Sequence, residues 1–171
     1  VDDHYLDPPL FYYSYENKNN LNLSKKMNEL FRKSYPELQQ KFQLKNIENK
    51  KIKIGFISEF FNKHTISKLF KGLIINLDKS LFDVNIFYLD NGKGLDQEFL
   101  NNEKGSNLKS FKLPKPFNDK TNIILDQNLD IIFYPDIGFS TQLYYLTFLR
   151  LAKIQITSWG HPETTGNTNI D

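Results

Sequence analysis

The part of the chain from residue 51 onward alternates between two apolar patterns. The period-two or unbroken apolar pattern of a strand occurs at 52–56, 82–88, 111–113, 131–134 and 154–158. The three-to-four spacing of an amphipathic helix occurs at 66–77, 118–127 and 141–151. The unbroken run Ile131–Tyr134 predicts a strand buried on both faces. This order predicts an α/β fold: a Rossmann-like three-layer domain with a mostly parallel sheet and helices on both faces.

Residues 1–50 have a different pattern, rich in Tyr and Asn at the start. A helix is predicted with one apolar face, ending or kinking at Pro36. The members of that face are Leu23, Met27, Leu30 and Phe31. The polar stretch 45–51 is typical of a linker, and 90–107 is typical of a loop with a short helix around 95–101. We therefore expect a helical lead-in over 1–50 and one Rossmann-like domain over 51–171.

Composition narrows the class of protein. The 171 residues carry 22 Lys and Arg against 20 Asp and Glu, and this balance does not favour nucleic acid or membrane as a partner. The absence of cysteine excludes disulfides, thiolate zinc sites and a cysteine nucleophile, and fits a cytoplasmic location. No stretch has the length and apolarity of a membrane span. The chain begins at Val1 without Met, so we expect that it was cut from a longer one.

Three loops follow predicted strands, where ligands bind in open α/β sheets. They cover residues 58–64, 135–140 and 159–166, and contain two of the three histidines and the only tryptophan. His64 opens a helix, where it could act as a general base or bind a phosphate, or merely cap the helix. Glu59 could orient a catalytic group or pair with Lys63. We expect the three loops to converge on one crevice.

The other candidates in these loops each have a structural alternative. Asp136 could bind an acceptor hydroxyl or form an Asx turn. His161 could reach the crevice or pack beneath its own tight turn. Thr164 and Thr165 could donate hydroxyls to a phosphate or a sugar, or could serve the turn that ends at Gly166. The residues alone indicate a polar crevice containing His64, and no reaction.

Several motifs are missing. The chain has no G-x-G-x-x-G after its first strand, no G-x-x-x-x-G-K-[ST], no D-x-D and no G-x-S-x-G. No cluster of histidines and carboxylates has metal-binding spacing. We therefore expect no dinucleotide, no P-loop nucleotide, no cofactor and no metal.

Three runs of residues resemble one family. Residues 53–69 are similar to a strand ending in Gly-aromatic-aliphatic-Ser, then an acidic residue, Phe and a His before a helix. Residues 149–155 are similar to Leu-Arg-x-Ala-Pro-Ile-Gln, and residues 159–166 to a Gly-x-Pro-Gly-Thr-Ser-Gly loop. In order and spacing these runs resemble the catalytic region of O-GlcNAc transferases and their bacterial, SPINDLY-like relatives, over about residues 51–171.

The resemblance implies the first half of a two-domain GT-B glycosyltransferase, with tetratricopeptide repeats ahead of it. It implies inverting, metal-independent transfer from a UDP-sugar, GlcNAc-like, or in some relatives a GDP-sugar, to a protein side chain. The partners implied are thus a nucleotide sugar and a protein acceptor. His64 and Glu59 match the family's active-site histidine and its acidic partner. Gly160, His161 and Pro162 match the loop that lines the donor and acceptor.

Two departures concern acceptor choice: Lys68 replaces the family's second histidine, and Glu163 replaces a glycine. The family's nucleotide-binding residues lie mainly in the second half, so we expect this chain alone to be inactive. Two alternatives remain, a sugar-nucleotide epimerase of the same fold and a non-catalytic interaction domain. The interaction domain would use exposed tyrosines, of which Tyr144 and Tyr145 fit core packing better. The tyrosines in question are Tyr12, Tyr13, Tyr144 and Tyr145.

Overall fold

A computed structural model describes residues 5–45, 50–89, 92–103 and 108–171 of the chain. Its helices are α1 (Leu10–Tyr13), α2 (Leu21–Ser34), α3 (Thr65–Asn76), α4 (Gln97–Glu103), α5 (Phe117–Asp126) and α6 (Thr141–Leu146), with short 3₁₀ turns η1 (Ser14–Glu16) and η2 (Pro36–Gln39). Its strands are β1 (Ile52–Ser58), β2 (Phe82–Leu89), β3 (Leu108–Leu113), β4 (Ile131–Tyr134) and β5 (Ile154–Thr157). The expected linker at 45–51 and loop at 90–107 lie partly outside the described residues.

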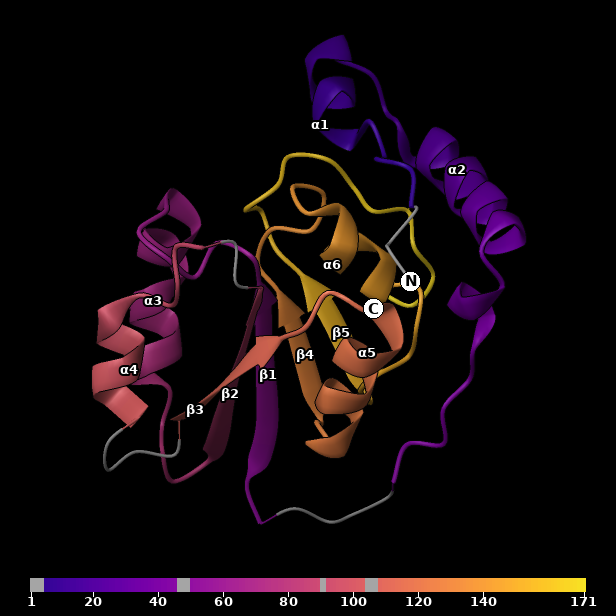
Figure 1. The fold of residues 1–171 in the computed structure, drawn as a ribbon. Coiled ribbons are helices and arrows are strands. Elements are labelled where there is room, and N and C mark those ends of the chain that lie inside the picture. Colours follow the sequence, from indigo (N-terminus) through magenta and orange to yellow (C-terminus); the bar gives the residue numbers. More distant parts are fainter. Residues whose placement is uncertain (1–4, 46–49, 90–91, 104–107) are drawn as a thin grey trace.

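The five strands form one parallel sheet in the order β3-β2-β1-β4-β5 (Figure 1). The chain winds outward from β1 to β3, crosses back to β4 beside β1, and then winds the other way to β5. The predicted α/β, Rossmann-like fold is therefore confirmed. The winding reverses between β1 and β4, so the loops after these two strands lie at the edge of the sheet where ligands bind in open α/β folds.

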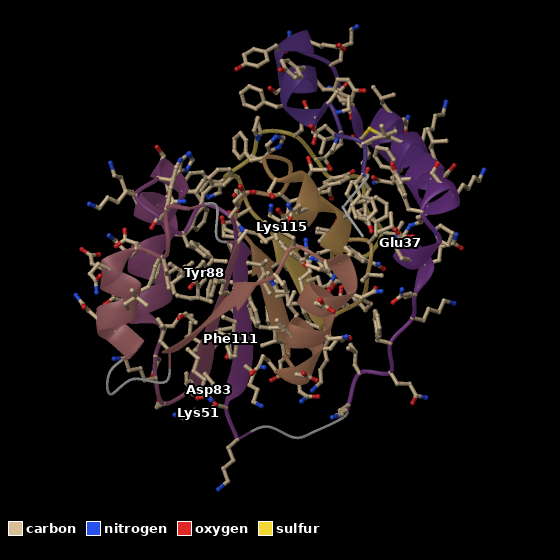
Figure 2. All side chains as sticks on the ribbon, in the orientation of Figure 1. Glu37, Lys51, Asp83, Tyr88, Phe111 and Lys115 are labelled. Atoms are coloured by element: carbon tan, nitrogen blue, oxygen red, sulfur yellow. The ribbon has the colours of Figure 1, made fainter. Side chains whose placement is uncertain are left out.

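Each face of the sheet has its own apolar core. Ile54 and Phe56 of β1 pack with α3 and α4, whereas Ile57 points the other way, toward α5 and α6. Figure 1 shows these two helix pairs on different sides of the strands. Figure 2 marks the edges: Lys51 and Asp83 lie at the amino end of the sheet, and Tyr88 near its carboxyl end.

Strand β4 is less enclosed than its sequence indicates. Ile132 and Tyr134 are fully buried, but Ile131 and Phe133 are only half-buried. The half-buried pair faces the core under α3 and α4, which lie mainly over β1, β2 and β3. The prediction of burial on both faces was therefore wrong for one face.

The packing face of α2 also differs from the predicted one. Leu23 and Leu30 are 43% and 59% exposed, whereas Ser24, Asn28 and Phe31 are buried. Asn28 donates a hydrogen bond to the carbonyl of Thr165 (2.8 Å). This side chain thus satisfies the buried carbonyl oxygen in place of a backbone N–H. The buried face of α2 is thus marked by the hydrogen bond of Asn28 and the core packing of Phe31, and not by Leu23 or Leu30.

Arg32 joins the lead-in to the domain. Its guanidinium donates to the carbonyls of Leu38 (3.0 Å) and Phe148 (3.1 Å) and to Oδ1 of Asn167 (3.2 Å), and lies 4.9 Å from the ring centre of Phe148. Nearby, Glu37 accepts a hydrogen bond from Tyr5 (Figure 2). Leu10, Phe31 and Leu38 belong to the same apolar core as α5 and α6. The lead-in therefore packs as part of this structure, while the boundary near residue 50 stays a prediction.

Helix α6 ends at Leu146, five residues before the end predicted for it. After Tyr144 the backbone N–H groups bond three residues back, as at Thr147 to Tyr144 (3.1 Å), so the helix tightens and stops. Tyr144 and Tyr145 are fully buried, as core packing requires.

Candidate functional site

A hydrogen bond between two buried side chains joins the loops at the reversal point of the sheet. Ser58 is the last residue of β1, and its Oγ donates to Oδ2 of Asp136, which follows β4 (3.0 Å). Backbone pairing between these strands ends before both residues, at the pair Phe56 and Phe133. The Ser58–Asp136 bond therefore connects the two strands beyond the end of their ladder.

Asp136 is a buried carboxyl group with few compensating partners. Only 3% of the residue is exposed. Burial raises its pKa to about 7, the bond from Ser58 opposes this, and the nearby charge of Glu59 adds to it. Asp136 can therefore gain or lose a proton near neutral pH, a property that a surface aspartate lacks.

His64 caps α3 with its ring. Nδ1 accepts the backbone N–H of Ile66 (3.2 Å), which is one of the helix's unpaired amino-terminal N–H groups. A nitrogen that accepts a hydrogen bond carries no proton, so the neutral ring holds its proton on Nε2. The half-buried His64 thus presents Nε2–H as a donor, and this geometry favours binding of an oxygen over abstraction of a proton.

Aromatic contacts connect His64 to the loop after β4. The ring of Phe60 lies 4.5 Å from that of His64 at an interplanar angle of 32°, and 6.0 Å from Phe139 in an edge-on contact. Glu59, which precedes Phe60, is half-buried, and its charge acts on Asp136. The first two predicted loops therefore meet as expected, through a hydrogen bond inside and ring contacts outside.

The start of the third loop joins the other two. The N–H of Gly160 donates to the carbonyl of Pro135 (3.1 Å), and a Cβ at position 160 would lie 2.2 Å from that oxygen. Gly138 has φ +124° and lies against the ring of His161, since a Cβ there would come within 2.6 Å of it. Both contacts need glycine, because a side chain would separate the loops.

His161 packs beneath its loop instead of opening into solvent. It is 4% exposed, contacts the edge of Phe139 at 4.8 Å, and uses Nδ1 to accept the N–H of Glu163 (3.2 Å). Burial lowers its pKa. Its Nε2 is buried with no hydrogen-bond partner among the described residues.

The rest of the third loop turns away toward the lead-in. Pro162 and Thr164 are exposed, and Thr165 is buried with its carbonyl bonded to Asn28. Thr164 and Thr165 line an open hollow of about 370 Å³ together with Lys25 of α2. The structure therefore places Gly160 and His161 against the loop that follows β4, but brings the two threonines together with α2.

Three residues at which these loops meet were not among the predicted site residues: Ser58, Phe60 and Phe139. Ser58 could have been found only by knowing that β1 lies beside β4, which the order of elements does not fix. Among the described residues, no group of three or more histidines and carboxylates is arranged to hold a metal. None of the helices in the same described ranges is both long and apolar enough to cross a membrane.

Comparison with known proteins identifies a similar fold. No family model matches the sequence, and no curated protein matches it. Among solved structures, the K341M mutant of the O-GlcNAc transferase of Thermobaculum terrenum is similar, with a TM-score of 0.68 over 88% of this chain at 14% identity. The match covers 28% of that transferase, so this chain spans less than a third of its length. The comparison supports a glycosyltransferase-like fold.

Proposed function

We propose that this chain is the acceptor-side half of a nucleotide-sugar-dependent glycosyltransferase. The observation that carries the proposal is the fold likeness to an O-GlcNAc transferase together with the meeting of three polar loops at the reversal point between β1 and β4. The proposed reaction is inverting, metal-independent transfer of a sugar, GlcNAc-like, from a UDP-sugar to a protein side chain.

In this proposal the residues where these loops meet bind and orient the reactants. The Nε2–H of His64 donates a hydrogen bond to an oxygen of the donor diphosphate or of the acceptor, and Nδ1 keeps the ring in place by capping α3. Glu59 belongs to the same loop, and its charge acts on Asp136. As the nucleotide departs, negative charge grows on its phosphate oxygens, where a fixed N–H donor stabilises it more than in the ground state.

We further propose that the 171 residues alone do not transfer sugar. The similar transferase is more than three times as long as the part matched here. A GT-B enzyme binds its donor between two halves, so one half offers an incomplete set of contacts. Weak donor binding and no turnover are the expected results for the chain by itself.

The natural full-length protein tests this proposal. UDP-GlcNAc, UDP-glucose, GDP-fucose and the free diphosphates are titrated by calorimetry, and transfer of each sugar to cell-extract proteins is assayed. His64→Asn is the informative variant, because asparagine retains a capping acceptor but lacks the outer N–H of the ring. Exposed Lys63→Ala is the neighbouring control.

We expect saturable binding of one donor, transfer by the wild type and by Lys63→Ala, and a loss of transfer of at least about 100-fold in His64→Asn. A donor converted to another sugar nucleotide without transfer would instead support an epimerase. A folded full-length protein that binds no donor and transfers no sugar would refute the proposal that it is a glycosyltransferase. The 74% exposure of Tyr12 and Tyr15 then favours an interaction domain.

A further inference from the structure

Ser58 is held by two hydrogen bonds at once. Its Oγ donates to Asp136 (3.0 Å) and accepts the backbone N–H of Phe60 (2.9 Å), and the residue is fully buried. A hydroxyl has a single proton, so donation to the carboxylate turns its lone pairs toward the backbone. Asp136 therefore determines how Ser58 holds the loop that follows β1.

The same loop carries His64. Phe60, whose N–H is held by Ser58, places its ring 4.5 Å from the imidazole and also contacts Phe139, from the loop of Asp136. The imidazole of His64 also accepts the capping hydrogen bond from the N–H of Ile66. A tilt of the imidazole would therefore have to displace the ring of Phe60 or break this bond.

We propose that Asp136 and Ser58 are positioning residues for His64, which act through the backbone and ring of Phe60. Neither need touch a ligand. Together they fix the loop so that Nδ1 of His64 stays on the Ile66 N–H and Nε2–H points outward. The inference rests on the proposed function only in taking His64 as the group that meets a ligand.

A matched control lies at the other end of the same two strands. Asp130 precedes β4, and its Oδ2 accepts the N–H of Lys53 in β1 (3.0 Å), while its Oδ1 accepts from Lys153 (2.8 Å). Asp130 therefore also joins β1 to β4, but far from His64. A variant at position 130 weakens the pairing of the strands without altering the loop.

The readout is the nitrogen NMR spectrum of His64 in the ¹⁵N-histidine-labelled chain, which reports the tautomer and needs no enzyme activity. The three histidines are assigned with single variants. The variants compared are Ser58→Ala, Asp136→Leu, Asp136→Asn, Phe60→Leu and Asp130→Asn. Asp136→Asn is the conservative variant, because its amide oxygen can still accept the proton of Ser58.

We expect a single Nε2–H tautomer of His64 in the wild type, in Asp136→Asn and in Asp130→Asn. Ser58→Ala, Asp136→Leu and Phe60→Leu are expected to show mixed tautomers and to lose the ring-current shift that Phe60 gives the imidazole protons. Circular dichroism and urea unfolding establish that each variant is folded.

An unchanged His64 spectrum in folded Ser58→Ala overturns the proposal, as does an equal change in Asp130→Asn. Phe60 is half-exposed, so Phe60→Leu should fold even if a buried variant does not, and an unchanged spectrum there also overturns it. If instead the tautomers respond as expected while the full-length protein transfers no sugar, the proposed function fails and the positioning role stands.

Discussion

Asp136 is the residue at which the structure makes its most quantitative prediction. A carboxyl group this deeply buried is more stable neutral than charged, and among the described residues Ser58 supplies its one side-chain hydrogen bond. Replacing it by asparagine removes the charge and keeps the size and an acceptor oxygen. We therefore expect Asp136→Asn to be more stable than the wild type at alkaline pH.

The magnitude follows from linkage between protonation and folding. The pKa of Asp136 is raised from an ordinary 3.8 to about 7 in the folded protein. Between these values the folded state binds more protons than the unfolded state, so the free energy of unfolding falls as pH rises and levels off above about pH 8. The cost is at most about 1.6 kcal/mol at about pH 5 and at most about 4 kcal/mol at about pH 8.

Urea unfolding of the wild type and of Asp136→Asn across this pH range is the assay. The variant's advantage in unfolding free energy should grow by about 2.5 kcal/mol between about pH 5 and about pH 8. Any constant effect of the amide cancels in that difference. The titration of His161, whose pKa is lowered, cancels too, because both proteins contain it.

Parallel stability curves for the two proteins, or an advantage that shrinks as pH rises, would refute this reasoning. Asp130→Asn serves as the control, because Asp130 is only half-buried and forms an ion pair with Lys153 (2.8 Å). Loss of that charge should give no gain in stability at alkaline pH.

Two further substitutions test how the loops and the lead-in are held. Arg32→Met keeps an apolar side chain of similar length but removes the guanidinium that donates to the carbonyl of Phe148 and lies over its ring. This variant should lower the free energy of unfolding by about 2–4 kcal/mol. Exposed Lys33→Met should change the free energy of unfolding by less than about 0.5 kcal/mol. Gly138→Ala should cost about 2–4 kcal/mol, and calorimetry should show part of this recovered when His161→Ala is added, because the new Cβ meets that ring. Equal losses for Arg32→Met and Lys33→Met, or additive losses at the Gly138 and His161 positions, would contradict these expectations.

The strands and most helices could be predicted because their apolar residues only need to face one of the two cores, and do not depend on a contact with one specific residue. Any apolar side chain at position 54 or 56 would fit the core on that side of β1, so the period-two pattern alone is enough to predict the strand. For α2 the prediction was right only in part: Phe31 and Met27 pack on the core, but Leu23 and Leu30 are exposed. Asn28 is buried because it meets Thr165, a residue 137 positions away in the chain, and no local pattern records that meeting.

The candidate site was predictable to the same extent. Parallel strands bring their carboxyl ends to one edge, so the convergence of three loops followed from topology. The division within the third loop did not. The N–H of Gly160 bonds to the carbonyl of Pro135, whereas the carbonyl of Thr165 accepts a hydrogen bond from Asn28 of α2. Both contacts involve residues that are distant in the sequence, so no local pattern predicts them. Ser58 was missed for a related reason, since its partner Asp136 follows β4, and the crossover of the chain determines which strand lies beside β4.

The two loop histidines use one local device with different consequences. In each, Nδ1 accepts the backbone N–H two residues later at 3.2 Å, so each neutral ring carries its proton on Nε2. His161 is 4% exposed beneath Phe139, and its Nε2 offers little to a ligand without movement of the loop. His64 is half-buried at the start of α3, with its ring against that of Phe60. Of the two, His64 is thus the ring whose free N–H can meet a substrate oxygen in the structure as it stands, and His161 is the ring that holds the third loop against Gly138.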